Sequence, residues 1–304
     1  MFPRWHHTQM LESAPAVPGP DDLDAGPTPN RPGPVRGPSA RAYLRMVLGE
    51  YALDQGGSVW TQTVVDALGL VGFEEKATRQ ALSRSATAGL LSPNRIGRRT
   101  CWQITPSGRE ALLAARARLF ATGPDPDWGG DWLILLTSVP ESHRNLRHRL
   151  RSSLGWAGFG SLGPGVWLSP HPSRAAEARQ VLAALGEPVQ GTLLHARLDD
   201  PEERLRLVAQ AWDVTVLDQQ YRAFIERFGP ARPGSPGAAL AHLTQLVYHW
   251  RRLLLADPGL PPGLQPAGWS GGRARQLLLE HRSRWHPTAA AWWAASIREN
   301  GGPQ

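Results

Sequence analysis

The apolar residues after position 39 first follow the spacing of two short helices. Ser39 stands at the start of the first, which is predicted by apolar residues at helical intervals: Tyr43, Met46, Val47 and Tyr51. A short extended piece at residues 58–60 follows. Thr61 is then the predicted N-cap of a second helix that runs to Leu68.

A third helix is predicted over residues 74–88. Its apolar positions Ala77 and Leu82, with Ala81 beside them, face a core, and polar side chains occupy the other face. Gly89 is suited to end the helix because glycine readily adopts the left-handed conformation of a helix C-cap.

Two extended segments, residues 90–95 and 99–105, then flank Gly97 and predict a β-hairpin. The order helix, helix, turn, helix, hairpin is that of a winged helix-turn-helix. In such a head the third helix enters the major groove of DNA and the hairpin, or wing, reaches the neighbouring phosphates.

The middle of the chain alternates between strand and helix patterns. Leu146, Leu150 and Leu154 form one helical stripe, and Ser173 is the predicted cap of a later helix. The expected order is βαββαβ, a ferredoxin-like unit, with its elements at residues 132–139, 141–154, 158–162, 165–169, 174–185 and 189–198.

The last third of the chain has the pattern of amphipathic helices rich in Leu, Arg and Trp. Helices are expected at residues 201–212, 219–228 and 238–255. Asp257 and Pro258 stop the last of them, and an ordered turn containing Trp269 follows.

Clusters of Pro, Gly and Asp separate these regions and predict a multidomain α+β protein. A tail rich in Pro and Gly is expected to be disordered. The expected organisation is a disordered tail at 1–38, a winged helix-turn-helix DNA-binding domain at 39–122, a ferredoxin-like central domain at 128–199 and a helical C-terminal domain at 201–300 for effector binding and dimerisation.

The distribution of charge supports DNA binding by the predicted winged helix-turn-helix. The chain has 33 basic and 26 acidic residues, a formal net charge of +7, and Lys76 as its single lysine. A GC-rich genome favours arginine throughout a protein, so position has to identify a binding surface. No acidic residue occurs from Lys76 to Arg99, and such a field favours phosphate binding. The candidate DNA-binding residues are Lys76, Arg79, Gln80, Ser83, Arg84, Arg95, Arg98 and Arg99. The alternative is a solvated surface used for protein contact.

Several motifs in the same order resemble the phenylacetate-degradation repressor family, PaaX. They include TRQALSR at residues 78–84, GVWLSP at 165–170 and YHWRRLLLADPGLP at 248–261. The resemblance spans about residues 40–279 and implies a bacterial repressor that binds a palindromic operator as a homodimer. Namesake members release DNA on binding phenylacetyl-coenzyme A. This chain departs from the family at Glu74–Glu75–Lys76–Ala77, where polar, uncharged residues are commoner, and at Trp102, where the family often has Tyr.

Aromatic residues beside arginines suggest where an acyl-coenzyme A effector would bind. Such residues can hold an aryl group next to a phosphate. The candidate effector-binding residues are Arg144, Arg147, Trp250, Arg251, Arg252 and Trp269. The alternatives are that the tryptophans belong to the core, that Arg251 pairs with Asp257, and that the arginines of residues 144–151 lie on a solvated helix face.

The remaining chemistry points away from an enzyme. One cysteine, Cys101, excludes an internal disulfide, and the chain shows no apolar run long enough for a membrane span, which together fit a cytoplasmic protein. The histidines form no metal-binding pair, so neither a metal nor a catalytic residue nor another cofactor is expected.

Two rival functions follow from the central domain and from the head. Ferredoxin-like domains also occur in CRISPR-associated metal nucleases, which need a carboxylate just after the first strand. Here Thr137 and Ser138 stand at that place, and the nearest acids are Asp131 and Glu141, so a magnesium nuclease is disfavoured. A pure interaction scaffold would show no salt-dependent binding to duplex DNA.

Overall fold

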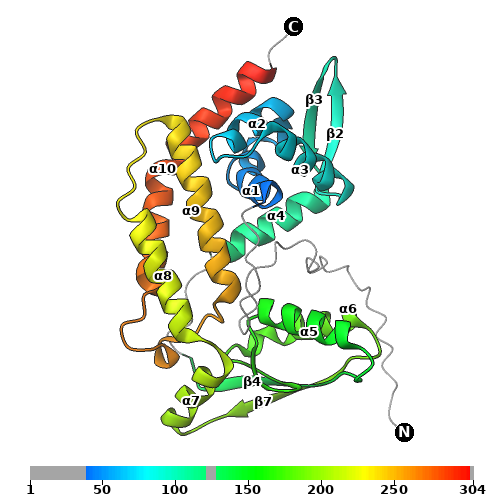
Figure 1. The fold of residues 1–304 in the computed structure, drawn as a ribbon, viewed down its shortest axis with the longest axis vertical. Coiled ribbons are helices and arrows are strands. Elements are labelled where there is room, and N and C mark those ends of the chain that lie inside the picture. The colour runs from blue at the N-terminus through cyan, green and yellow to red at the C-terminus, as the bar shows by residue number, and fades with distance from the viewer. Residues whose placement is uncertain (1–38, 121–127, 302–304) are drawn as a thin grey trace, which may run out of the picture.

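The computed structural model describes residues 39–120 and 128–301. The expected disordered tail and most of the expected linker after residue 120 lie outside the described residues. Within them the fold is a mixed α+β structure with two antiparallel sheets (Figure 1). The helices of the last third of the chain run beside the N-terminal region, and the four-stranded sheet lies at the other end of the molecule (Figure 1).

The N-terminal region has its helices and strands in the predicted order. Ser39 caps the first helix, because its Oγ accepts a hydrogen bond from the Ala42 amide at 3.2 Å. Strands β2 and β3 form the hairpin, and β1 pairs with the other edge of β3. The elements are α1 (Ala40–Val47), η2 (Leu48–Ala52), η3 (Leu53–Gln55), β1 (Ser58–Trp60), α2 (Thr61–Gly69), α3 (Glu75–Thr87), β2 (Leu91–Ile96), β3 (Arg99–Ile104) and α4 (Pro106–Leu119).

One expected helix cap in this region is wrong. Thr61 is the first residue of α2, the capping position belongs to Trp60, and no side chain caps this helix. The hydroxyl of Thr61 instead donates to the Thr100 carbonyl at 3.1 Å and accepts from the indole of Trp102 at 2.9 Å. Thr61 therefore ties α2 to the hairpin strand β3.

The central region is a four-stranded sheet in the order β5-β6-β4-β7, antiparallel throughout. Helices α5 and α6 cover one face through a cluster that contains Leu146, Leu150 and Leu154. Ser173 does not cap α6 as expected, because it lies inside a 3-10 turn and Arg174 precedes the helix. The elements are β4 (Asp131–Ser138), α5 (Arg144–Trp156), β5 (Gly160–Gly163), β6 (Val166–Ser169), η4 (Pro172–Arg174), α6 (Ala175–Leu185) and β7 (Gln190–Arg197).

Helix α7 (Pro201–Ala211) packs on the other face of this sheet. Its Val208 and Ala211 share a buried cluster with Trp132 of β4. Leu260 and Leu264, which follow the helix at Pro236–Ala256, belong to the same cluster. The sheet is therefore covered on both faces, and part of one cover comes from the distant end of the chain.

The C-terminal region contains more helix than the sequence predicts. Its elements are α8 (Val214–Phe228), α9 (Pro236–Ala256), η5 (Pro262–Leu264) and α10 (Gly271–Gly301). Helix α8 begins before the expected Gln219 because the carboxylate of Asp213 accepts from the Val216 amide at 3.0 Å and caps it. Helix α10 has 31 residues, includes Pro287 on an exposed face, and was not expected.

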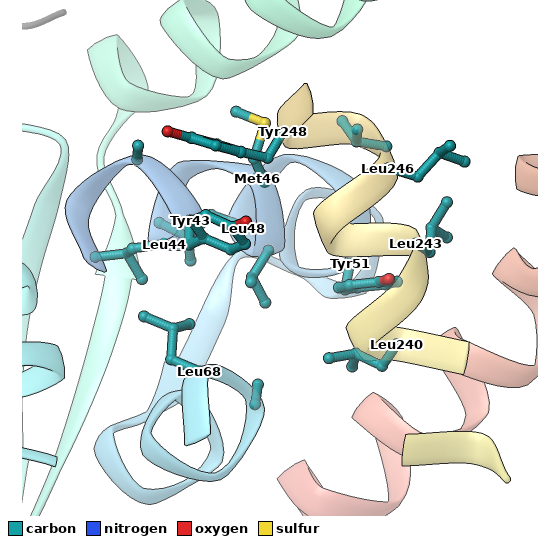
Figure 2. Packing of buried hydrophobic residues seen from close by; sticks show 14 of the residues in the cluster. Tyr43, Leu44, Met46, Leu48, Tyr51, Leu68, Leu240, Leu243, Leu246 and Tyr248 are labelled. Carbon is teal, nitrogen blue, oxygen red and sulfur yellow. The ribbon is translucent and has the colours of Figure 1, made fainter. Parts of the chain in front are cut away.

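The N-terminal region and helices α8–α10 share one buried hydrophobic cluster. Figure 2 shows Tyr248 of α9 next to Tyr43 of α1, and Leu240 of α9 near Tyr51 of η2. The rings of Tyr43 and Tyr248 stack with centroids 4.4 Å apart. We call this assembly, α1–α4 with β1–β3 and α8–α10, the head–helix unit, and β4–β7 with α5–α7 the central unit.

Candidate nucleic-acid interface

Helix α3 has one buried face and one polar face. It starts after Glu74, and Gly89, with φ of 75°, follows its end. The buried residues recur every three or four positions and pack against α1 and α2, which leaves the opposite face to solvent. All five residues of the helix that the sequence singles out for DNA binding are exposed: Lys76, Arg79, Gln80, Ser83 and Arg84.

A shallow open depression lies on this exposed face. It is lined by Glu75, Lys76, Arg79, Gln80 and Ser83. Glu75 is the acidic member, and its Oε1 accepts a hydrogen bond from Arg79 Nε at 2.7 Å. The structure therefore joins four predicted residues at one site and adds Glu75, which the sequence marked as unusual without giving it a role.

The hairpin next to α3 presents arginines around a tight turn. Ile96 pairs with Arg99 across the strands, and Gly97 takes a left-handed φ of 60°, which only glycine adopts readily. Strand β2 is the edge of its sheet and tolerates Pro93 for that reason. The side chains of Arg95, Ile96, Arg98 and Arg99 are all exposed.

One of these arginines also bonds within the protein. Arg99 Nη1 donates to the carbonyl oxygen of Asn300 at 2.7 Å. This carbonyl lies in the last turn of α10, where carbonyls lack helical partners and a positive charge is favourable. Arg99 therefore joins the hairpin to the end of the C-terminal helix.

The same end of α10 also bonds to α2. The Thr63 hydroxyl donates to the Ser296 carbonyl at 3.2 Å, and Asn300 Nδ2 donates to Thr63 Oγ1 at 3.2 Å. Gly301 lies so close to the Trp60 indole that a Cβ there would approach Nε1 to 2.5 Å. The region that presents α3 and the hairpin is thus fastened to α10.

The expected effector residues do not meet in one place. Trp250 is buried, and its indole donates to the Leu119 carbonyl at 2.9 Å. Trp250 and Trp269 both contact the ring of Tyr221, with centroids 6.0 and 5.5 Å apart. Because these contacts lie within the hydrophobic cluster, the core alternative describes Trp250 better than a ligand pocket does.

The four arginines of the effector set lie on two different helices. Arg144 and Arg147 are at the start of α5, where Arg147 forms an ion pair with Glu141 at 3.1 Å. Arg251 and Arg252 are half-buried near the end of α9. Burial lowers the pKa of His249, and the charges of Arg227 and Arg252 lower it further, so Arg252 acts inside the head–helix unit.

A polar junction that the sequence does not single out joins the two units. His171 Nε2 lies 2.8 Å from the Gly259 carbonyl, and Arg174 Nη1 donates to the Ala157 carbonyl at 2.7 Å. The Asp257 carboxylate accepts from the Tyr221 hydroxyl and from the Gly259 amide.

Burial shifts the two charges of this junction in opposite directions. It lowers the pKa of Arg174 to about 10 and raises the pKa of Asp257, while the attraction between the two groups opposes both shifts. Gly158 is required here, because a Cβ would lie 1.2 Å from Arg174 Nη1. The sequence signal for the site was the Asp-Pro-Gly run itself, which otherwise indicates only a turn.

Comparison with known protein families covers most of the chain. A model described as PaaX-like protein matches residues 39–108, the PaaX protein central Cas2-like domain matches residues 125–208, and the PaaX-like protein C-terminal domain matches residues 212–295. The transcriptional repressor PaaX of Escherichia coli (strain K12) is 30% identical over 265 residues, which are 84% of this chain and 83% of that protein.

The chain belongs to the PaaX family. Among solved structures, the uncharacterized protein Rv0674 from Mycobacterium tuberculosis has a similar fold, with a TM-score of 0.56 and 20% sequence identity over 85% of this chain and 98% of that one. In this PaaX-family protein, no helix of the described residues has the length and apolar character needed to cross a membrane.

Proposed function

We propose that this chain is a cytoplasmic transcriptional regulator, a repressor that binds duplex DNA through a winged helix-turn-helix. Helix α3 is the recognition helix and the β2–β3 hairpin is the wing. The observation that carries the proposal is the set of six exposed basic residues on α3 and the neighbouring hairpin, from Lys76 to Arg99, in a chain related to a transcriptional repressor.

The exposed residues of α3 and the hairpin fall into two groups, according to whether they would contact base edges or the DNA backbone. Arg79, Gln80, Ser83 and Arg84 lie along the helix that enters the major groove, so we assign them to base edges and nearby phosphates. Lys76, Arg95 and Arg98 are assigned to the DNA backbone, where they position the protein without reading sequence. Arg99 holds the wing to α10 with one terminal nitrogen and offers its other N–H groups to a phosphate.

The full proposal follows the family resemblance further. The protein acts as a homodimer on a palindromic operator, the central unit is ferredoxin-like, and an acyl-coenzyme A, such as phenylacetyl-coenzyme A, releases the DNA. We favour the border between the two units for the effector. The buried guanidinium of Arg174 there is a partner suited to an anionic ligand, and the border joins two regions with separate cores.

Selection from a random duplex library, followed by equilibrium binding at several salt concentrations, tests the DNA-binding proposal. Arg98→Ala should weaken binding to all sequences alike, whereas Gln80→Ala should relax specificity at one base pair. Intact affinity and specificity in both variants would show that this surface is not the DNA reader.

The effector proposal has a separate test on the selected duplex. Phenylacetyl-coenzyme A should reduce the shifted fraction in a mobility-shift assay, and free coenzyme A at the same concentration should not. Equal effects of the two compounds would contradict an acyl-specific effector.

Nothing in the structure favours the nuclease alternative. No group of three or more His, Cys, Asp or Glu side chains that could hold a metal ion occurs in residues 39–120 and 128–301. A magnesium-dependent nuclease assay on the selected duplex remains the direct check.

A further inference from the structure

The acidic start of α3 is the feature of the DNA-facing surface that the proposed function leaves unexplained. Glu74 and Glu75 are both exposed, and Glu75 lines the same depression as Lys76, Arg79, Gln80 and Ser83. A negative charge at a surface that meets phosphates weakens binding to every sequence, because like charges repel. An acidic residue on this surface is therefore expected to have a function that offsets the loss of affinity.

Stability of the helix is a weak explanation for Glu75. Its ion pair with Arg79 has the i, i+4 spacing, and the two side chains are 57% and 53% exposed. Exposed pairs of this kind contribute little, because water screens the charges and ordering two long side chains costs entropy. Glu74 already supplies a negative charge at the same helix end, next to the partial positive charge of the first turn.

The hydrogen bond between the two side chains sets a preferred direction for the Arg79 guanidinium. Glu75 Oε1 accepts from Nε, the nitrogen on the inner edge of the group, at 2.7 Å. The guanidinium is planar, so a carboxylate on the Nε edge leaves the edge formed by the two terminal nitrogens pointing away from the carboxylate. That outer edge is the one that binds O6 and N7 of a guanine through two parallel hydrogen bonds.

We propose that Glu75 is a positioning residue for DNA reading, which holds Arg79 with its outer edge presented to a guanine in the major groove. The inference rests on the proposed function and adds to it a named base and a residue that sets specificity. Glu75 gives up some affinity for phosphates in return for a preferred orientation of Arg79. Approach of the DNA strengthens the pair, because it removes water from around the two charges.

Glu74 provides a matched control. It is the neighbouring residue, has the same charge, is also exposed, and stands at the capping position without a side-chain capping bond. Glu74→Ala therefore removes one negative charge from the same helix end and leaves the Arg79 contact in place. Glu75→Ala removes the charge and the hydrogen-bond acceptor together, whereas Glu75→Gln removes the charge and keeps an oxygen that can accept from Nε.

The experiment selects binding sites from a random duplex library with the full-length wild-type chain and then measures each variant on the selected duplex and its single-base changes. Arg79→Ala should identify the guanine, because its loss should abolish the preference for that base. A bidentate arginine contact gives a preference of roughly 5- to 150-fold. Glu75→Ala should reduce that preference to less than a third of the wild-type value, and Glu75→Gln should restore most of it.

The control variants separate orientation from charge. Glu74→Ala should tighten binding to all duplexes by a similar factor and leave the base preference unchanged. Glu75→Ala should have no further effect on base preference when Arg79 is already alanine, because the carboxylate then has no guanidinium to orient.

Two outcomes overturn the inference, and they are distinguishable. If the wild-type chain shows no salt-dependent binding to any duplex, the proposed function fails and the inference fails with it. If the wild-type chain binds but Glu75→Ala behaves as Glu74→Ala does, only the positioning role of Glu75 is wrong.

Discussion

The head–helix unit and the central unit differ in how their parts are held together. In the head–helix unit, residues from the first and last thirds of the chain share one hydrophobic cluster, and Tyr51 lies against Trp293 with ring centroids 5.7 Å apart. The central unit has its own clusters on the two faces of its sheet. The proposed DNA-facing surface is therefore part of a larger body and does not stand on a separate small domain.

The border between the two units has a different character. Leu260 and Leu264 pack under the sheet and α5 contacts α9. Across the border, Arg118 donates to the Trp156 carbonyl and His171 bonds to the Gly259 carbonyl. Polar contacts can be exchanged for contacts with water or a ligand more readily than a close-packed core can be opened. The proposed effector is thus expected to change how the units sit relative to each other, with α3, the β2–β3 hairpin and α10 moving together.

The largest effect is expected when a large buried side chain is removed from each unit in turn. Trp293→Ala should lower the free energy of unfolding by about 3–5 kcal/mol, and Leu133→Ala in the central sheet by about 2–5 kcal/mol, because both side chains are fully buried. Hydrogen exchange followed by mass spectrometry should show faster exchange in α1–α3 only for Trp293→Ala. Faster exchange of α1–α3 in Leu133→Ala would contradict separate units.

A buried ion pair inside the head–helix unit gives a smaller expected effect. Arg282 Nε of α10 donates to Glu50 Oε2 of η2 at 2.9 Å, and Glu50 is 3% exposed. Arg282→Met should cost about 3 kcal/mol, because it leaves a buried carboxylate without its partner. Adding Glu50→Gln should recover part of this loss in denaturant unfolding. No recovery in the double variant would show that the pair does not join α10 to η2 as described.

The pH dependence of stability should show the contribution of a buried histidine of the head–helix unit. Burial, with help from Arg227 and Arg252, lowers the pKa of His249 from 6.5 to about 4. The folded chain therefore resists protonation of His249, and stability should fall as the pH drops from about 6.5 toward 4. Unfolding by denaturant at several pH values should show a flatter profile for His249→Gln. An identical profile would mean that His249 does not contribute.

The sequence predicts the local structure of the DNA-facing surface well. The apolar spacing of α3 fixes which side chains are outside, and Gly89 and Gly97 mark its end and the turn of the hairpin because both need a positive φ. The order of strands and helices in the central unit follows from short apolar runs separated by Gly and Pro. These are local signals, and they fix local structure.

The parts that the sequence does not predict depend on long-range contacts. An amphipathic pattern shows that α9 has an apolar face but not that α1 covers it. The bond from Arg99 to Asn300 joins residues 201 positions apart. Helix α10 was not predicted, although its buried residues before Pro287 recur at helical spacing. Trp250 was assigned to an effector site because the sequence does not show whether a tryptophan lies in the core or lines a pocket.

The central claim is that the head–helix unit carries the DNA contacts and the central unit does not. Both units expose arginines, so the most direct measurement is the salt dependence of affinity for the selected duplex in two matched variants, Arg98→Ala in the wing and Arg149→Ala on the exposed face of α5. Arg98→Ala should reduce the slope of log affinity against log salt concentration by about 1, and Arg149→Ala should leave it unchanged. A reduced slope for Arg149→Ala with an unchanged slope for Arg98→Ala would contradict the account.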